Sequence, residues 1–277
     1  MTVSDFKRIA VQKLSEVTDN AAFEASQLMC HVLSCTENQL LINKASALNE
    51  KELSVLNFAL EERMKHVPIQ YICKEWDFFG LKMHCGPGCL IPRPETEMLV
   101  EMCIKSLKQG ATMLDLCTGS GCIAVSVMKN RPDAMCVAVD ISDEALVYAI
   151  KNAEFHGVED RIKYVQNDAF AFKPDKKFDL IVSNPPYIKT MDMENLSPEV
   201  KKEPYIALDG GEDGLDFYKL MSSEYKNYLS ENGCILVEVG YDIYNEVADL
   251  FIKQGFITEI ITDMYGVQRI VHAYKKQ

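Results

Sequence analysis

An asparagine followed by two prolines and a tyrosine, Asn184 to Tyr187, is the segment of this chain best suited to bind a small planar ligand. It follows the apolar run from Phe178 to Val182, which predicts a buried strand. Neither proline has an N–H group, and each disfavours helix in the residue before it, so the strand has to end at Asn184. The Asn184 side-chain oxygen and the Pro185 carbonyl can then accept hydrogen bonds from a –C–NH2 group. We expect Tyr187 to lie against the flat face of that group.

A glycine-rich loop lies upstream of this segment, in the stretch Asp115-Leu-Cys-Thr-Gly119-Ser-Gly121-Cys-Ile-Ala124. Its glycines permit a tight turn and a close approach of a ligand to the start of the next helix. Asp140 ends the following strand about twenty residues on, where an acid accepts both hydroxyls of a ribose. Asp168 ends the third strand and is placed to accept an adenine amino group. An ordinary strand-ending turn is the alternative for Asn-Pro-Pro-Tyr, and the loop upstream favours ligand binding.

Two nucleotide cofactors are compatible with this loop. The spacing Gly119-x-Gly121-x-x-Ala124 fits a dinucleotide fingerprint, so a nicotinamide-dependent dehydrogenase is an alternative. Asp115, however, would place a negative charge beside a pyrophosphate, whereas it suits the ammonium of a methionine moiety. Together with Asp168 this favours S-adenosylmethionine. A glycine loop that only packs is the remaining alternative, and the acids at 140 and 168 argue against it.

The elements that position these residues alternate between strand and helix, which predicts a parallel sheet covered on both faces. We expect strands over 113–117, 134–140, 162–165, 178–182 and 234–239, helices over 95–106, 121–128, 142 onward, 216–229 and 244–253, and a final β-pair over 256–262 and 269–274. A polar insert covers 189–214. The proline-rich stretch before Glu95 is either a helix cap or a loop that covers the cofactor, and composition does not separate these two.

The first part of the chain has a different pattern of apolar residues, which is that of helices alone. Residues 1–66 show only one-sided helical apolar patterns, and the aromatic-rich stretch from Ile69 to Met83 resembles a β-hairpin. We therefore expect a helical substrate-docking domain over 1–68, a β-hairpin linker over 69–88 and a catalytic domain over 89–277.

Composition excludes several classes of protein. The 277 residues carry a net charge of −12, which argues against a protein that tracks along nucleic acid, so we expect no direct DNA binding. No apolar stretch is long enough to span a membrane, and no signal sequence is evident, so we expect a cytoplasmic protein. The ten cysteines include no CxxC pair, which predicts reduced thiols and no metal site.

With this loop, these two acids and Asn-Pro-Pro-Tyr after the fourth strand, the sequence resembles the class I S-adenosylmethionine-dependent methyltransferases that modify amide or amino nitrogens. Among these it is most similar to the HemK/PrmC family of release factor glutamine methyltransferases. The resemblance covers nearly the whole chain, including Pro68-Ile-Gln-Tyr71, Leu90 to Glu97 and the stretch from Glu203 to Leu215. It implies a Rossmann-like methyltransferase sheet (fold class α/β) with a small N-terminal helical bundle joined by a β-hairpin.

The resemblance also implies an activity, which is transfer of a methyl group from S-adenosylmethionine to N5 of the glutamine in the Gly-Gly-Gln loop of class I peptide-chain release factors by a monomeric enzyme. It implies cofactor contacts, with Asp115 added from the argument above, at Cys117, Thr118, Gly119, Ser120, Gly121, Asp140, Asp168, Ala169 and Asn184. It places the substrate on Asn184, Pro185, Pro186 and Tyr187, with Asn184, Pro185 and Tyr187 catalytic. A methyltransferase acting on a nucleic-acid amine, and a catalytically silent cofactor-binding module, are the alternatives.

The sequence departs from the family pattern at two places. The family commonly has glycine where Cys117 stands, and a polar glutamine soon after Glu238-Val-Gly240, where Asp242 and Tyr244 stand here.

Overall fold

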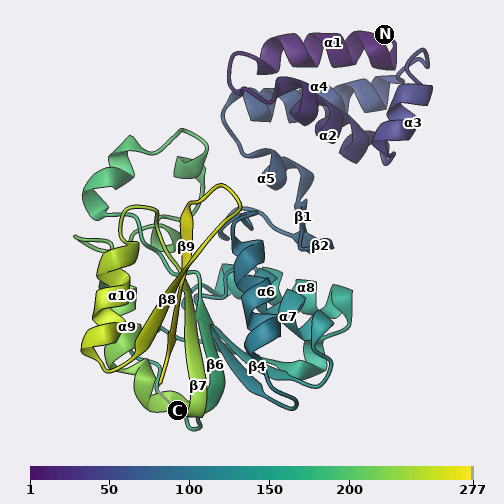
Figure 1. Cartoon of the computed structure of the whole chain (residues 1–277). Coiled ribbons are helices and arrows are strands. Elements are labelled where there is room, and N and C mark those ends of the chain that lie inside the picture. Colours follow the sequence, from purple (N-terminus) through teal and green to yellow (C-terminus); the bar gives the residue numbers. More distant parts are fainter. Residues whose placement is uncertain (276–277) are drawn as a thin grey trace. The chain divides into compact units, whose positions relative to one another are not determined.

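The computed structural model describes residues 1–275 and divides into two compact units, whose elements are labelled in Figure 1. One unit contains residues 1–75 together with 197–202, and the other contains 76–196 and the residues from 203 onward. The domain boundaries that we expect after residues 68 and 88 stay a prediction. Among residues 1–275, every helix is too short or too polar to cross a lipid bilayer.

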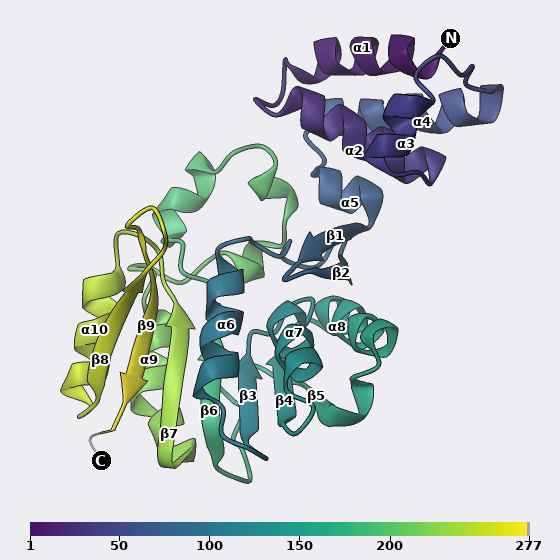
Figure 2. The same cartoon turned by 45° about the vertical axis from the view of Figure 1, so that its right-hand side comes forward.

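The first unit is a bundle of helices: α1 (Val3–Leu14), α2 (Ala21–Leu33), α3 (Glu37–Ile42), α4 (Glu50–Met64) and α5 (Ile69–Cys73). Thr2, Thr36 and Asn49 begin α1, α3 and α4 with capping boxes, in which each side chain accepts the N–H of the residue three positions on. The helices α1, α2 and α4 pack against one another (Figure 2). Their shared core is apolar and includes Phe6, Leu14, Leu28, Met29, Leu56 and Leu60.

Two charged side chains, Arg63 and Glu24, are buried in this bundle and pair with each other. Arg63 on α4 is only 1% exposed, and its Nε donates to Glu24 Oε2 at 2.6 Å. Its Nη2 donates to Glu24 Oε1 at 3.2 Å and also pairs with Glu199, from the short segment 197–202. A buried charge is tolerated only when it is paired, so these two glutamates keep the guanidinium ionised.

The predicted β-hairpin is wrong at its beginning, because residues 69–73 form the helix α5. Ile69, Tyr71 and Cys73 are buried in alternation, which imitates a strand. The N–H groups of Tyr71 and Ile72 nevertheless both bond to the Pro68 carbonyl and close a helical turn. The hairpin itself is shorter and consists of β1 (Glu75–Phe78) and β2 (Leu81–His84).

The second unit is built on a seven-stranded sheet in the order β5-β4-β3-β6-β7-β9-β8. Its parallel strands are β3 (Thr112–Leu116), β4 (Met135–Asp140), β5 (Ile162–Gln166), β6 (Phe178–Ser183) and β7 (Leu229–Glu238). The strands β8 (Ile257–Thr262) and β9 (Gln268–Tyr274) form an antiparallel pair at one edge. The predicted parallel sheet is confirmed.

Helices cover both faces of this sheet, as Figures 1 and 2 show. α6 (Thr96–Ser106), α7 (Cys122–Asn130) and α8 (Asp143–His156) pack on one face, over a core that includes Leu99, Met113 and Leu180. α9 (Asp216–Ser223) and α10 (Tyr244–Lys253) pack on the other, over a core that includes Ile181, Val237 and Phe251. The carboxyl ends of all five parallel strands therefore lie together at one end of the sheet, where ligands bind in open α/β sheets.

The predicted helix over 216–229 is too long. α9 ends at Ser223, a 3₁₀ turn follows over Tyr225–Tyr228, and β7 already begins at Leu229. Leu229 pairs with Phe178 and Cys234 pairs with Leu180, so the four intervening residues of β7 bulge out of register. They include Glu231, Asn232 and Gly233, which hide the strand in the sequence pattern.

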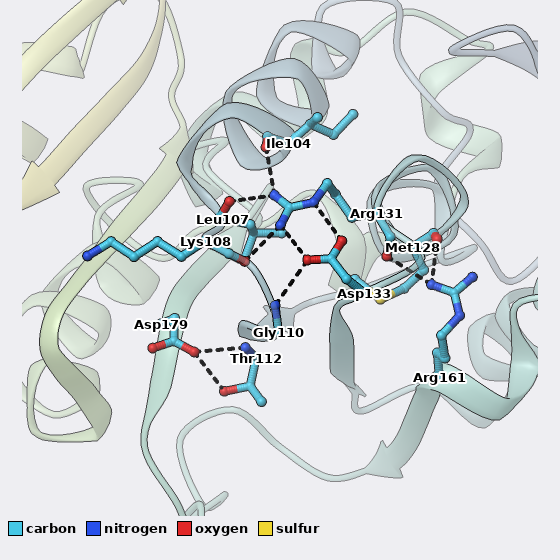
Figure 3. Close-up of polar contacts among 10 residues, drawn as sticks. All are labelled: Ile104, Leu107, Lys108, Gly110, Thr112, Met128, Arg131, Asp133, Arg161 and Asp179. Atoms are coloured by element: carbon cyan, nitrogen blue, oxygen red, sulfur yellow. Dashed lines mark hydrogen bonds and ion pairs between the residues drawn. The ribbon is translucent and has the colours of Figure 1, made fainter.

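At the opposite end of the sheet, where the parallel strands begin, two arginines bind the carboxyl ends of helices (Figure 3). Arg131, directly after α7, donates to the carbonyls of Ile104, Leu107 and Lys108 at the end of α6, and pairs with Asp133 at 2.8 Å. Arg161 donates to the carbonyls of Met128 and Arg131 at the end of α7. Each guanidinium therefore satisfies the carbonyls that a helix leaves without partners at its carboxyl end.

Candidate functional site

A cavity of about 290 Å³ lies in the second unit, at the edge where the parallel strands end. Segments that follow β3, β4, β5 and β6 all contribute to its lining, as do the loop 88–93 and the insert between β6 and α9. Its apolar wall includes Ile91, Ile123, Val139, Ile141, Phe170 and Phe217. The rings of Phe170 and Phe217 pack edge to face, with their centroids 5.2 Å apart. The size and lining are those of a small-molecule site.

Most of the residues singled out in the sequence meet at this cavity. The lining includes Cys117, Thr118, Gly119, Ser120, Asp140, Asp168, Ala169, Asn184 and Pro186. In the described part of the chain, the four that do not line it are Asp115, Gly121, Pro185 and Tyr187. The first two lie beneath the glycine-rich loop and in its last turn, and the other two flank Pro186.

The glycine-rich loop alternates in backbone conformation. Cys117, Gly119 and Gly121 have φ angles of 58°, 56° and 76°, in the left-handed region. Asp140 holds the middle of this loop, because its Oδ2 accepts the Gly119 N–H at 2.8 Å. Its Oδ1 accepts the Ser142 N–H at 3.0 Å, at the start of α8. The Gly119 N–H is thereby occupied by a carboxylate and is not offered to a phosphate.

Asp115 at the end of β3 is fully buried, and this burial raises its pKa to about 7. Its Oδ2 accepts the Thr118 hydroxyl at 2.6 Å. Its Oδ1 has no hydrogen-bond partner within residues 1–275. A buried carboxylate oxygen without a partner is costly, so a cationic or N–H-bearing ligand group that reached it would be bound strongly.

Asn184 is held by a chain of hydrogen bonds that reaches from β6 across to β7. Its Nδ2 donates to Thr96 Oγ1 at 3.1 Å, and that hydroxyl donates to Glu238 Oε2 at 2.7 Å. Thr96 is the first residue of α6, and Glu238 is the last residue of β7. The side-chain oxygen of Asn184 is therefore the amide atom left to a ligand.

The backbone of Pro186 and Tyr187 lies against the insert that follows it. Two backbone hydrogen bonds join Ile188 to the insert. The Ile188 N–H donates to the Leu208 carbonyl at 2.9 Å, and the Gly210 N–H donates to the Ile188 carbonyl at 2.8 Å. A Cβ at Gly210 would lie 2.7 Å from Tyr187 Cα, so only glycine permits this approach. The insert thus fixes where the Asn-Pro-Pro-Tyr segment runs.

The stretch before α6 covers the cavity, which separates the two interpretations that the sequence left open. Leu90 to Arg93 line the cavity, and Glu203 holds them by accepting the Ile91 N–H at 3.0 Å and pairing with Arg93. Glu95 stands at the N-cap of α6 but makes no side-chain capping hydrogen bond. The covering loop is therefore the better description of these residues.

Three functional candidates were missed in the sequence, namely Thr96, Glu203 and Glu238. Thr96 and Glu203 lie in stretches that carry the family resemblance, but neither spacing nor periodicity shows which partner any of the three meets. Glu238 offered one signal, since it is the only acidic side chain in the otherwise apolar run 234–239.

The charges around the cavity define its chemistry. Within residues 1–275 the charged side chains that line it are Asp140, Asp168 and Arg93, and Arg93 is neutralised by Glu203. The balance is negative, which suits a cation that also carries hydroxyl and amino donors and disfavours a pyrophosphate. These residues therefore fit S-adenosylmethionine better than a dinucleotide.

Comparison with known proteins agrees with this chemistry. Residues 94–200 match the model of the methyltransferase small domain, and residues 7–73 match that of the PrmC N-terminal domain. The release factor glutamine methyltransferase of Thermodesulfovibrio yellowstonii is 36% identical, over 97% of this chain and 99% of that protein. The release factor glutamine methyltransferase of Geobacter sulfurreducens is 40% identical, over 91% of this chain and 89% of that protein.

A solved structure supports the fold alone. The crystal structure of a methyltransferase from Pyrococcus furiosus superimposes with a TM-score of 0.56 at 19% identity, covering 82% of this chain and 98% of that one. Because full-length relatives exceed 30% identity over nearly the whole chain, this protein belongs to the release factor glutamine methyltransferase family.

Proposed function

We propose that this chain transfers a methyl group from S-adenosylmethionine to N5 of the glutamine in the Gly-Gly-Gln loop of peptide-chain release factors. The observation that carries the proposal is the position of Asn184. Its free amide oxygen stands at the same cavity as Asp140 and Asp168, the two acids that suit the cofactor. A planar amide and a methyl donor can therefore meet at one place.

The cofactor would be held by the two carboxylates that line the cavity, Asp140 and Asp168, and by Asp115 beneath the glycine-rich loop if the ligand reaches that far. Each oxygen of Asp140 accepts one backbone N–H, and a carboxylate oxygen accepts two hydrogen bonds, so each retains capacity for one ribose hydroxyl. Asp168 would accept the adenine amino group, while Asp115 Oδ1 would accept the ammonium of the methionine moiety. When bound, S-adenosylmethionine supplies an electrophilic methyl group and leaves as S-adenosylhomocysteine.

The protein's own residues have to orient a poor nucleophile. The lone pair of a glutamine amide nitrogen is delocalised into its carbonyl, so position and electrostatics decide the rate. Asn184 Oδ1 and the Pro185 carbonyl would accept the two hydrogens of the –NH2 group and fix the nitrogen in line with the methyl group. These two dipoles also stabilise the positive charge that grows on the nitrogen in the transition state. Tyr187 would support the face of the amide, and burial, which raises its pKa to about 12, keeps its hydroxyl neutral.

The release factor as substrate is supported by the names of the full-length relatives. A nucleic-acid amine is the alternative substrate, because the resemblance given by the sequence extends to methyltransferases that modify amino nitrogens. The net charge of −12 opposes it, since the chain would repel a phosphate backbone. An enzyme that modifies a translation factor is expected to act in the cytoplasm.

One labelling experiment tests the proposal. The chain is incubated with methyl-labelled S-adenosylmethionine and either an intact release factor, a release factor with the loop glutamine replaced by alanine, or total RNA and DNA. We expect label only on the intact factor, mapped by mass spectrometry to the glutamine side chain. Label on nucleic acid, or undiminished label on the alanine factor, would reject this substrate.

A further inference from the structure

The side chain of Asn184 has two ends of nearly the same shape, and only one of them serves an amide substrate. With Oδ1 toward the substrate, the side chain accepts a hydrogen from the –NH2 group. With Nδ2 toward the substrate, two donors would face each other. Packing alone cannot choose between the two orientations, because oxygen and NH2 differ little in size. A hydrogen-bonding partner has to choose.

Thr96 is that partner, and its hydroxyl has a single hydrogen to give. Thr96 Oγ1 donates this hydrogen to Glu238 Oε2 at 2.7 Å. It can therefore only accept from Asn184, and the amide end that donates is Nδ2, at 3.1 Å. Thr96 and Glu238 are 1% and 4% exposed, so water does not compete for these contacts. The charge on Glu238 thus sets the direction of both hydrogen bonds.

We infer that Thr96 and Glu238 are positioning residues, which turn the Asn184 amide so that Oδ1 faces the substrate nitrogen. This inference rests on the proposed function, since it concerns the same reaction. Neither residue needs to touch the substrate or the cofactor methyl group. Thr96 also lines the cavity, but its hydroxyl is already bonded to Glu238 and Asn184, so we expect the effect of both residues on the reaction to pass through Asn184.

The arrangement also reverses with the protonation of Glu238. Burial raises the pKa of this carboxyl to about 7, with a further increase from Glu95 and opposing effects from Thr96, Arg269 and Arg93. Once protonated, Glu238 can donate to Thr96, whose hydroxyl can then donate to Asn184 and favour the unproductive orientation. Other titratable groups that face Glu238 are Tyr187, Tyr218 and Cys122. All three remain neutral near pH 7, because burial raises each pKa.

The first test replaces the hydroxyl without changing the shape. Thr96→Val should lower the single-turnover rate of release factor methylation about tenfold, the effect of losing one buried hydrogen bond. The dissociation constant of S-adenosylmethionine should stay the same, and Thr96→Ser should restore most of the rate. Thr112→Val is the matched control, because the Thr112 hydroxyl also meets a carboxylate, Asp179 at 3.3 Å, at the far edge of the sheet. It should react like the wild type.

The second test separates positioning from packing. In an Asn184→Asp background the two ends of the side chain are identical, so nothing remains to be oriented. Thr96→Val should then change the residual rate by less than about twofold. An equal loss in both backgrounds would overturn the inference, because it would mean that Thr96 acts through the fold.

The third test follows pH. The wild-type rate should fall as the pH decreases through about 7, because Glu238 becomes protonated. S-adenosylmethionine is kept saturating throughout, so that protonation of Asp115, whose pKa is also about 7, does not limit the rate through cofactor binding; Glu238→Gln, which can donate as well as accept, should then be slow and lose this pH dependence. A fall that persists unchanged in Glu238→Gln would contradict the assigned role. The wild type is the control that separates the two proposals. If it does not methylate the release factor, the proposed function fails. If Thr96→Val reacts at the full rate, only the positioning role is rejected.

Discussion

Cys117 combines a side chain with a backbone conformation that favours glycine. Its φ of 58° brings Cβ close to the following carbonyl, which costs about 1–2 kcal/mol in an L-residue. The family commonly has glycine at this position, and the structure gives the physical reason. The cofactor loop of this chain therefore carries local strain, which is held in place by hydrogen bonds from the Thr118 N–H to the Val139 carbonyl and from the Gly119 N–H to Asp140.

Substitution at this residue should show the strain directly. We expect Cys117→Gly to have a higher free energy of unfolding than Cys117→Ala, by about 1 kcal/mol, because alanine keeps the Cβ. Urea unfolding of both variants measures the difference. The same pair at Cys103, a buried position inside α6, is the control, and there alanine should be the more stable variant. If the alanine variant were the more stable one at position 117 as well, residue 117 would not be strained.

Asp115 should make stability depend on pH. Its folded pKa of about 7 lies above the ordinary value of 3.8, so between these values the folded state binds more protons than the unfolded state. The contribution of this group to the free energy of unfolding therefore falls as the pH rises from about 4 to about 7. Above about 7 the whole of this loss of stability, the deficit due to Asp115, is present.

Asp115→Asn should remove that deficit, since asparagine carries no charge to bury. We expect the stability of the variant relative to the wild type to grow between pH 4.5 and pH 8 in urea unfolding without cofactor. Glu238 contributes equally to both proteins and cancels in the difference. A difference that does not change with pH would mean that the buried carboxylate costs nothing.

At the scale of the element, arginines at the amino-terminal edge of the sheet hold the ends of two helices (Figure 3). Arg131→Lys keeps the charge but loses the planar group that serves the carbonyls of α6. We expect the free energy of unfolding to fall by about 1–3 kcal/mol. The affinity for S-adenosylmethionine should not change, because the cavity lies at the other edge.

Lys105→Met is the comparison for that experiment. Lys105 also lies near the end of α6, but its pair with Glu101 is exposed at 3.3 Å, so its loss should cost at most about 0.5 kcal/mol. Equal effects of the two substitutions would show that helix-end carbonyls are not what Arg131 stabilises.

The sheet could be predicted from the sequence because each strand is an apolar run with clear ends. Tyr244–Lys253 is α10 as expected, and the ends of β3 and β6 lie within a residue of the prediction. The errors occur where local pattern and tertiary contact disagree. Residues 69–73 alternate like a strand although Pro68 starts a helix there, and the bulge in β7 hides its first half.

The candidate site was predictable only where residues adjacent in the chain make it. The glycine-rich loop and Asn-Pro-Pro-Tyr are such segments. Thr96 and Glu238 are 142 positions apart, and no periodicity or composition connects them. The same holds for Glu203 and Ile91, 112 positions apart. Contacts of this kind follow from the order of the strands, which the sequence pattern does not specify.

At the scale of the whole molecule, we expect the helical unit to serve the protein substrate and not the chemistry. Every residue that lines the cavity belongs to the second unit. Deleting residues 1–66 should therefore leave the affinity for S-adenosylmethionine unchanged, measured by calorimetry, while methylation of an intact release factor collapses. A short peptide that contains the Gly-Gly-Gln loop is the control, and both forms should methylate it equally. Full activity of the truncated enzyme on the intact factor would refute the docking role.

The segment 197–202 gives this architecture a consequence for recombination. The chain leaves the helical unit after Glu75, returns for Ser197–Lys202 and leaves again, so the unit is encoded by two separate pieces of the gene. Arg63 comes from the first piece and its partner Glu199 from the second. A chimera made by one crossover at residue 75 would take these two side chains from different parents. Exchange of the helical unit between relatives therefore requires a matched pair of crossovers around residues 197–202 as well.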